Sequence, residues 1–232
     1  MKQGNELTLP DALAGDDVRF ADDLAAYFIQ RFTKSGDLVF DPFAGFGTTL
    51  FMAEKLGRIG CGIELLPERA AYIRSIIHGK SRIFCASALD IERLALPEID
   101  FSITSPPYMS QNDHEEYPFA AYQKTGADYQ QYLLDIQEVF RQLQARLKPE
   151  AYAVIEISNI VHNGMLTTLA WDVAAKVGEV MTLVKEIVIN WHSGDPTVLN
   201  GDPDSSHMCR KVSGSYGFGY DHSYCLIFRN KP

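Results

Sequence analysis

Residues 104–108 read Thr-Ser-Pro-Pro-Tyr and directly follow an apolar segment, residues 99–103, that has the character of a buried strand. Proline cannot donate a ladder hydrogen bond and has a fixed φ, so Pro106 and Pro107 end the strand and hold the next backbone segment rigid. The residue before a proline disfavours the helical region, which leaves the Pro106 carbonyl available as an acceptor. Ser105 offers a second acceptor, and Tyr108 offers a ring face for stacking. These four residues thus place two acceptors and a ring face on a rigid segment at a strand end.

A second cluster lies at residues 41–49, Asp-Pro-Phe-Ala-Gly-Phe-Gly-Thr-Thr, where a short apolar strand is expected to turn into a helix. Glycines at such a turn let a ligand approach the backbone closely, and a helix N-terminus favours negative charge. Glu64 follows about 20 residues later at the end of the next predicted strand, where a carboxylate can accept hydrogen bonds from both hydroxyls of a ribose. The pattern indicates a nucleoside-binding site.

Two familiar nucleotide-binding motifs fit this sequence poorly. A nicotinamide dinucleotide site normally has a third glycine, but Thr48 and Thr49 follow Gly47. Residues 79–81, Gly-Lys-Ser, resemble the end of an ATP-binding P-loop, but Arg74 stands where its first glycine is required. A purely structural turn is the remaining alternative.

The elements that must position these residues alternate along the chain between helical and strand patterns, which predicts an α/β fold with a mostly parallel sheet covered by helices on both faces. A chain of 232 residues suits one such domain. We expect seven strands, at residues 37–40, 59–65, 82–86, 99–104, 151–157, 183–191 and 223–229. Helices are expected near residues 20–32, 48–56, 67–79, 129–147 and 166–177.

Together, "DPFAGFGTT", "GIEL" and "TSPPY" resemble the cofactor-binding and catalytic motifs of S-adenosylmethionine-dependent DNA methyltransferases that modify exocyclic amines, the N4-cytosine and N6-adenine family of the SPPY type. The resemblance extends over nearly the whole chain and implies a single Rossmann-like class I methyltransferase domain, 1–232. It implies S-adenosylmethionine as the cofactor. The cofactor-binding residues would be Asp41, Pro42, Phe43, Ala44, Gly45, Gly47 and Thr48, with Glu64 at the ribose and Ser87 near the adenine.

The same resemblance implies a catalytic role for Ser105, Pro106, Pro107 and Tyr108. The base would leave the duplex stack, and its amine would take the methyl group by direct displacement, without a nucleophilic cysteine. Serine at the first position of the Ser-Pro-Pro-Tyr motif resembles enzymes that make N4-methylcytosine, whereas Asp or Asn at that position is more usual in those that make N6-methyladenine. Cytosine N4 is favoured, and adenine N6 stays open. Two further hypotheses are an RNA methyltransferase acting at guanine N2 and a non-catalytic cofactor-binding subunit.

The chain leaves no room for a separate target-recognition domain, so loops near residues 109–126 and 192–220 are expected to read the substrate. Lys124, Arg210 and Lys211 are the predicted nucleic-acid contacts, and Tyr117, Phe119 and Tyr122 could stack on bases or seal the first loop. A partner protein or a homodimer could compensate for the small size. DNA, duplex or single-stranded, is the expected substrate, in a restriction-modification setting.

The composition restricts these hypotheses. The formal net charge of −9 is unusual for a nucleic-acid-binding protein and favours a local basic patch or a partner subunit. The four cysteines and six histidines form no pair with metal-ligand spacing, so we expect buried thiols and no metal. The chain has no signal-peptide pattern and no apolar run of roughly 20 residues, which predicts a cytoplasmic protein without membrane contact.

Overall fold

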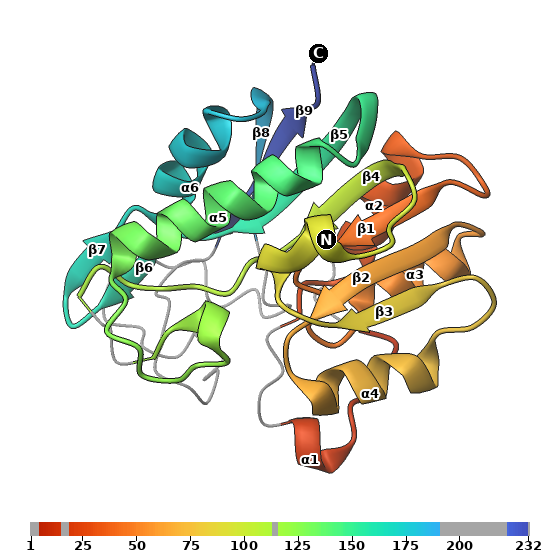
Figure 1. Cartoon of the computed structure of the whole chain (residues 1–232), viewed down its shortest axis with the longest axis horizontal. Helices are drawn as coiled ribbons and strands as arrows, with labels where there is room; N and C mark the ends of the chain where they lie inside the picture. The colour runs from red at the N-terminus through yellow and green to blue at the C-terminus, as the bar shows by residue number, and fades with distance from the viewer. Residues whose placement is uncertain (1–4, 15–18, 113–115, 191–221, 232) are drawn as a thin grey trace, which may run out of the picture.

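The computed structural model describes residues 5–14, 19–112, 116–190 and 222–231. A seven-stranded sheet with the order β3-β2-β1-β4-β5-β9-β8 forms its centre (Figure 1). Its strands are β1 (Leu38–Asp41), β2 (Ile59–Glu64), β3 (Arg82–Cys85), β4 (Ile99–Thr104), β5 (Leu147–Ile157), β8 (Thr182–Asn190) and β9 (His222–Arg229). All pairings from β3 to β5 are parallel, and β9 runs antiparallel between β5 and β8. The predicted α/β fold with a mostly parallel sheet is confirmed.

Helices cover both faces of this sheet (Figure 1). On one face lie α2 (Asp22–Phe32), α3 (Thr48–Lys55) and α4 (Pro67–Ile76), with apolar side chains packed against β1 to β4. On the other face lie α5 (Tyr129–Gln144), α6 (Leu169–Gly178) and the 3-10 helix η1 (Ala88–Arg93). Two short elements, α1 (Asp11–Ala14) and the 3-10 helix η2 (Pro118–Ala120), are the remaining helices of the described residues.

The strand order reverses between β1 and β4, because β2 and β3 lie on one side of β1 and the later strands on the other. In open α/β sheets, ligands bind at the carboxyl ends of the strands beside such a reversal. The glycine loop (residues 41–49) follows β1, and the Ser-Pro-Pro-Tyr segment (residues 105–108) follows β4. Both predicted motifs therefore lie at the edge where a ligand is expected.

Helix α5 follows from its sequence. Leu133, Ile136 and Phe140 recur at helical spacing and are buried, and the Asp128 side chain caps the helix by accepting from the Gln131 amide at 2.9 Å. The predicted extension of this helix to residue 147 is wrong, because it ends at Gln144.

The segment after α5 instead begins β5, and it includes Lys148 and Pro149, which the sequence predicts to lie just past the helix. Leu147 pairs with Ile99, and the register then shifts before Tyr152 pairs with Phe101, so the proline lies in an irregular part of the ladder. The Asn230 side chain also donates to the Leu147 carbonyl at 2.9 Å, which fixes this start of the strand from the far end of the chain.

A second difference concerns residues 160–167, where β6 (Ile160–His162) and β7 (Met165–Thr167) form a hairpin. The helix expected from about residue 166 begins only at Leu169. Asn163 and Gly164 connect the two strands with φ values of 50° and 74°. Asn-Gly is the sequence that such a two-residue turn favours, so the chain does contain a local signal for this hairpin.

The two loops assigned to substrate reading differ in what the structure describes. The first contains η2 and an antiparallel bridge between Tyr117 and Gln123. The whole of the second, residues 192–220 with Arg210 and Lys211, lies outside the described residues. In the part of the chain that is described, no helix is both long enough and apolar enough to cross a membrane.

Candidate functional site

Asp41 links the two motifs at the ends of β1 and β4. Its carboxylate is 1% exposed and accepts hydrogen bonds from the Thr49 hydroxyl at 2.6 Å, the Thr104 hydroxyl at 2.6 Å and the Phe43 amide at 3.0 Å. Burial raises its pKa to about 6, although these three donors act in the opposite direction. The Thr104 bond holds the glycine loop against the strand that leads into the Ser-Pro-Pro-Tyr segment.

Glu64, the last residue of β2, is hydrogen-bonded to the glycine loop. Its carboxylate accepts from the Gly45 amide at 2.9 Å and from the Leu66 amide at 2.8 Å, one bond at each oxygen. Burial raises the pKa of this carboxyl, while the Leu66 amide and the nearby Arg69 lower it. Each carboxylate oxygen has a further lone pair, so Glu64 can still accept bonds from two ligand hydroxyls.

The two glycines of the loop have different surroundings. Gly47 has a φ of +86°, and a Cβ there would lie 3.0 Å from Cγ1 of Ile73 on α4. Gly45 has a φ of +56°, and the nearest atom to a Cβ there is the Phe43 carbonyl oxygen at 3.9 Å. Gly47 therefore allows α3 to pack against α4, whereas Gly45 presents bare backbone toward open space. Gly45 is the position that a ligand can approach.

Thr48 opens α3 directly after Gly47. Its hydroxyl oxygen is buried and has no hydrogen-bond partner among the described residues. Buried polar atoms nearly always have a partner, so an orphaned hydroxyl beside Gly45 points to a ligand that would supply one. Together with the Glu64 carboxylate, this side chain fits the polar groups of a nucleoside cofactor.

The other predicted cofactor residues line the same edge. Pro42 and Ala44 are buried, and the Ala44 amide donates to the Ile63 carbonyl at 2.8 Å. Phe43 is half-buried, with its ring centre 5.7 Å from that of Phe119. Ser87 lies just after β3, where its hydroxyl caps η1 by accepting from the Leu89 amide at 3.2 Å. That capping bond uses one lone pair of the Ser87 hydroxyl.

Ser105 lies beside a carboxylate that the sequence motifs do not include. The Ser105 hydroxyl lies beside the Glu156 carboxylate and the Tyr108 hydroxyl and lowers the pKa of both. Glu156 lies near the end of β5, is 7% exposed, and also has the hydroxyl of Ser223 of β9 beside it. Burial raises the pKa of Glu156, and the two serine hydroxyls lower it. A charged residue within the apolar run of β5 is the signal that could have found it, since glutamate is rarely buried without a partner.

The rest of the Ser-Pro-Pro-Tyr segment is held from two sides. The Tyr108 hydroxyl accepts from the Ser158 amide at 2.8 Å, and the Tyr132 hydroxyl donates to the Pro107 carbonyl at 2.8 Å. Burial raises the pKa of Tyr108 well above its usual range, so the phenol stays protonated. No described residue donates to the Pro106 carbonyl. That carbonyl, the Ser105 hydroxyl and the Tyr108 ring follow one another directly after β4.

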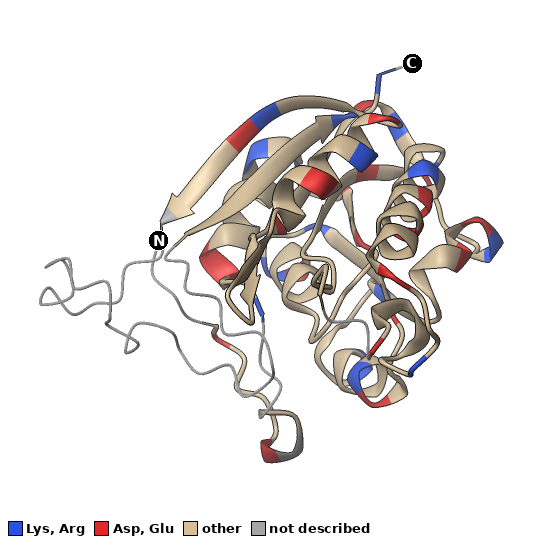
Figure 2. Ribbon diagram, turned by 90° about the vertical axis from the view of Figure 1, so that its left-hand side faces the viewer, with Lys and Arg blue, Asp and Glu red and all other residues tan. Residues whose placement is uncertain are grey.

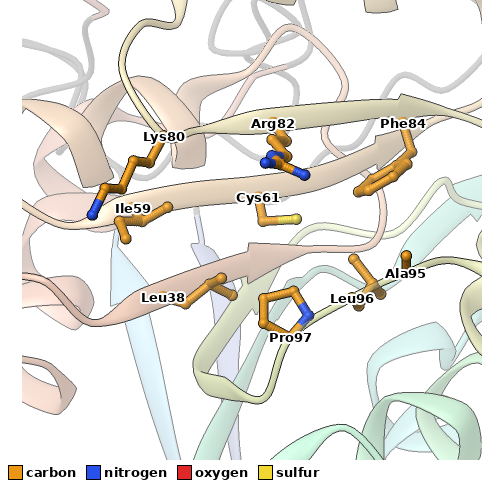
Figure 3. Close-up of a pocket in the computed structure, with 9 residues that line it drawn as sticks. All are labelled: Leu38, Ile59, Cys61, Lys80, Arg82, Phe84, Ala95, Leu96 and Pro97. Atoms are coloured by element: carbon orange, nitrogen blue, oxygen red, sulfur yellow. The ribbon is translucent and has the colours of Figure 1, made fainter.

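A sizeable pocket lies elsewhere and does not belong to this site (Figure 3). Its lining includes the first residues of three strands, Leu38 of β1, Ile59 of β2 and Arg82 of β3, as well as Leu96, Pro97 and, further along β3, Phe84. The glycine loop and Glu64 lie at the opposite ends of these strands. The pocket is therefore not the nucleoside site.

The described residues contain no cluster of His, Cys, Asp or Glu suited to a metal ion. Cys61 and Cys225 are buried, as expected for core thiols, and Cys85 is exposed. Burial raises the pKa of Cys61 to about 12, which makes this thiol unreactive at neutral pH.

Lys124, the predicted nucleic-acid contact, is exposed on the first loop.

A family model described as DNA methylase matches residues 17–75, a stretch that includes the glycine loop and Glu64 and ends before the Ser-Pro-Pro-Tyr segment. No curated protein matches the chain.

Solved structures match over most of the chain. TrmN from Thermus thermophilus is 14% identical with a TM-score of 0.60, over 94% of this chain and 52% of its own. An rRNA methylase from Streptococcus thermophilus is 8% identical with a TM-score of 0.54, over 90% and 96%. SMU.1697c from Streptococcus mutans, in complex with SAH, is 11% identical with a TM-score of 0.51, over 89% and 96%. The chain spans about half the length of TrmN. From the sheet order and these likenesses together, the chain has the Rossmann-like fold of class I S-adenosylmethionine-dependent methyltransferases.

Proposed function

We propose that this chain is an S-adenosylmethionine-dependent methyltransferase that modifies an exocyclic amine of a flipped DNA base, cytosine N4 in preference to adenine N6. The observation that carries the proposal is the Asp41 carboxylate, which joins the glycine loop to the strand leading into the Ser-Pro-Pro-Tyr segment through the Thr104 hydroxyl at 2.6 Å. A cofactor site and an amine-binding site are thereby held side by side. The match to a DNA methylase family over residues 17–75 supports the DNA substrate.

The residues present fit the cofactor. Thr48 would give its orphaned hydroxyl to the methionine part, the open face of Gly45 would admit it, and Glu64 would accept from the ribose hydroxyls. When bound, S-adenosylmethionine supplies an electrophilic methyl group on a positively charged sulfur. The buried carboxylates of Asp41 and Glu64 favour that charge at this edge of the sheet.

The Ser-Pro-Pro-Tyr segment would bind and orient the amine. Each hydroxyl has one proton, so the arrangement that satisfies all three groups has Tyr108 donating to Ser105 and Ser105 donating to Glu156. A lone pair of Ser105 and the Pro106 carbonyl then accept the two N–H bonds of the amine. Held in this way, the nitrogen lone pair is directed away from the ring and toward the methyl group.

Glu156 would also receive the proton that the amine loses. Methylation would form a bond from nitrogen to the methyl carbon as the bond from that carbon to sulfur breaks, and the nitrogen would carry a positive charge until an N–H proton departs. That proton passes to the Ser105 oxygen as the Ser105 proton passes to the Glu156 carboxylate. A carboxyl whose pKa is raised by burial is a better proton acceptor than an ordinary glutamate.

The same proposal includes the organisation of the protein. The chain would act as one methyltransferase domain, with the loops after β4 and β8 contacting duplex or single-stranded DNA. Lys and Arg are interspersed with Asp and Glu on the described surface (Figure 2). Several cations are already paired, for example Arg141 with Glu92 and Glu138, and Lys176 with Glu179. A partner protein or a second copy would supply the missing phosphate contacts.

Labelled S-adenosylmethionine, incubated with the purified protein and separately with duplex DNA, single-stranded DNA and total RNA, tests the proposal by nucleoside mass spectrometry. We expect label in N4-methylcytosine. Label in N6-methyladenine would keep the mechanism and change the base. A protein that binds the cofactor but labels none of the three substrates would overturn the proposal.

The second candidate is an RNA base methyltransferase, for instance at guanine N2. The observation in its favour is the likeness to structures named TrmN and rRNA methylase. Label confined to the RNA sample would establish this second candidate.

A further inference from the structure

The first loop contains a strained turn. The Tyr117 amide donates to the Gln123 carbonyl at 3.1 Å, and the Gln123 amide donates to the Ala120 carbonyl at 3.0 Å. Between these bonds, Ala121 has a φ of 52° and Tyr122 a φ of 60°. Two consecutive residues in the left-handed region are typical of a type I′ turn, which strongly favours Asn-Gly.

This turn has side chains where glycine or asparagine is expected. The hairpin between β6 and β7 uses Asn163 and Gly164 at the equivalent positions. A bulky residue with positive φ is a genuine outlier, and such outliers cluster at ligand-binding sites. The Tyr122 ring is 41% exposed, so burial of the ring does not compensate for the strain.

The surrounding structure fixes the turn firmly. Tyr117 is 6% exposed, and its hydroxyl donates to the Asp135 carboxylate on α5 at 2.5 Å. The Phe119 ring lies between Phe43 of the glycine loop and Tyr132 of α5, with centres 5.7 Å and 6.1 Å apart. Tyr117 is buried and Phe119 is half-buried, so both pack inside the loop, whereas Tyr122 is exposed.

The turn also lies close to the proposed catalytic segment. Tyr132 contacts Phe119 and donates its hydroxyl to the Pro107 carbonyl. Burial raises the pKa of Tyr132, and the electrostatic effect of Tyr122 raises it further. Contacts from Pro107 through Tyr132 to Phe119 thus lead from the Ser-Pro-Pro-Tyr segment to the loop that carries Tyr122.

We propose that Tyr122 is a second stacking subsite, which binds a nucleobase flanking the base that is methylated. The inference rests on the proposed function only in assuming that the substrate is a nucleic acid. Tyr108 is half-buried and its hydroxyl is held by the Ser158 amide, so its ring suits the target base. Tyr122 is held rigidly at the surface, which suits an adjacent base that has lost its stacking partner.

Binding of a fluorescent oligodeoxycytidine, measured with S-adenosylhomocysteine present, tests this subsite without requiring catalysis. The matched probe has the same backbone with abasic sites. Tyr122→Leu should weaken binding of the oligodeoxycytidine by roughly 5- to 100-fold and leave the abasic probe unaffected. Tyr122→Phe keeps the ring and should bind like the wild type. Tyr27→Leu is the control, because Tyr27 is 47% exposed on α2.

A second readout separates a binding role from a structural one. Tyr122→Gly should raise the thermal unfolding midpoint, because glycine tolerates a φ of 60°, while it weakens binding. The subsite is refuted if the wild type does not prefer the base-bearing probe, if Tyr122→Phe loses as much affinity as Tyr122→Leu, or if Tyr122→Gly lowers stability. If these variants behave as expected but no nucleic acid is methylated, the proposed reaction fails and the subsite stands.

Discussion

Ser105 and Glu156 together carry the proposed chemistry, so their replacement should affect turnover more than binding. Ser105→Ala removes an acceptor and the proton path, and we expect kcat to fall about 100-fold or more with little change in cofactor affinity. Single-turnover methyl transfer and calorimetric cofactor binding measure the two effects. An unchanged rate in Ser105→Ala would contradict the mechanism.

The pH dependence of turnover tests Glu156 separately. The carboxylate form accepts the proton, so activity should fall as pH drops through the pKa of Glu156, and burial moves this loss to higher pH than for an ordinary glutamate. Glu156→Gln should be slow and should lack this acidic limb. Glu179→Gln, at an exposed carboxylate after α6, should retain it. An identical acidic limb in Glu156→Gln would assign the titration to another group.

Asp41 should affect stability in a way that depends on pH. Its folded-state pKa of about 6 lies above its unfolded value, so the folded state binds more protons between about pH 4 and 6, and unfolding becomes easier as pH rises. A shift of this size corresponds to about 3 kcal/mol. Most of this is lost between about pH 4 and pH 7, so over that range Asp41→Asn should gain about 2 kcal/mol of unfolding free energy relative to wild type. Urea unfolding at both pH values checks this; a constant difference would refute it.

At the scale of elements, alanine substitutions at the two loop glycines should distinguish a role in helix packing from a role in cofactor binding. Gly47→Ala places a Cβ 3.0 Å from Ile73 at a φ of +86°, and should cost about 1–3 kcal/mol of stability. Gly45 also has a positive φ, +56°, so an alanine there is strained as well, but its Cβ has its nearest neighbour 3.9 Å away. Gly45→Ala should therefore cost less stability than Gly47→Ala and should weaken cofactor binding more. Thermal unfolding and titration calorimetry on both variants provide the comparison. Equal effects on both quantities would contradict the assignment.

The elements could be predicted where local patterns decide them. The buried positions of α5 follow from helical spacing, and the strands of the parallel part follow from short apolar runs. The end of α5 could not, because residue 147 is drawn into β5 by pairing with Ile99 and by the side chain of Asn230. That competition between helix and strand depends on distant residues. The turn at Asn163 and Gly164 differs, because its signal is local even though the strands beside it are short.

The residues of the candidate site show the same distinction between local signals and effects of distant residues. The glycine loop, Glu64 and Ser105 could be identified from residue type and position. Thr49 and Thr104, which bind Asp41, and Glu156, which binds Ser105, could not be assigned. Their roles depend on which strands are neighbours, and that order is a property of the folded sheet.

At the scale of the whole molecule, the charge distribution predicts weak dependence of nucleic-acid binding on salt. The chain has a net charge of −9 and several basic side chains are paired with acids, so few phosphates should be neutralised. Lys124→Ala should reduce the slope of log affinity against log salt by about 1. Fluorescence titrations at several salt concentrations measure the slope. An unchanged slope would remove Lys124 from the interface.

The position of β9 also affects how the protein emerges from the ribosome. β5 is synthesised well before β9, yet β9 pairs with it along six residue pairs, from Tyr152–Arg229 to Ile157–Tyr224. Until residues 222–229 have been translated, one edge of β5 has no partner and β8 has no place in the sheet. An open apolar edge is a template for association between chains. We therefore expect this edge of β5 to stay open to other chains until residues 222–229 are inserted between β5 and β8.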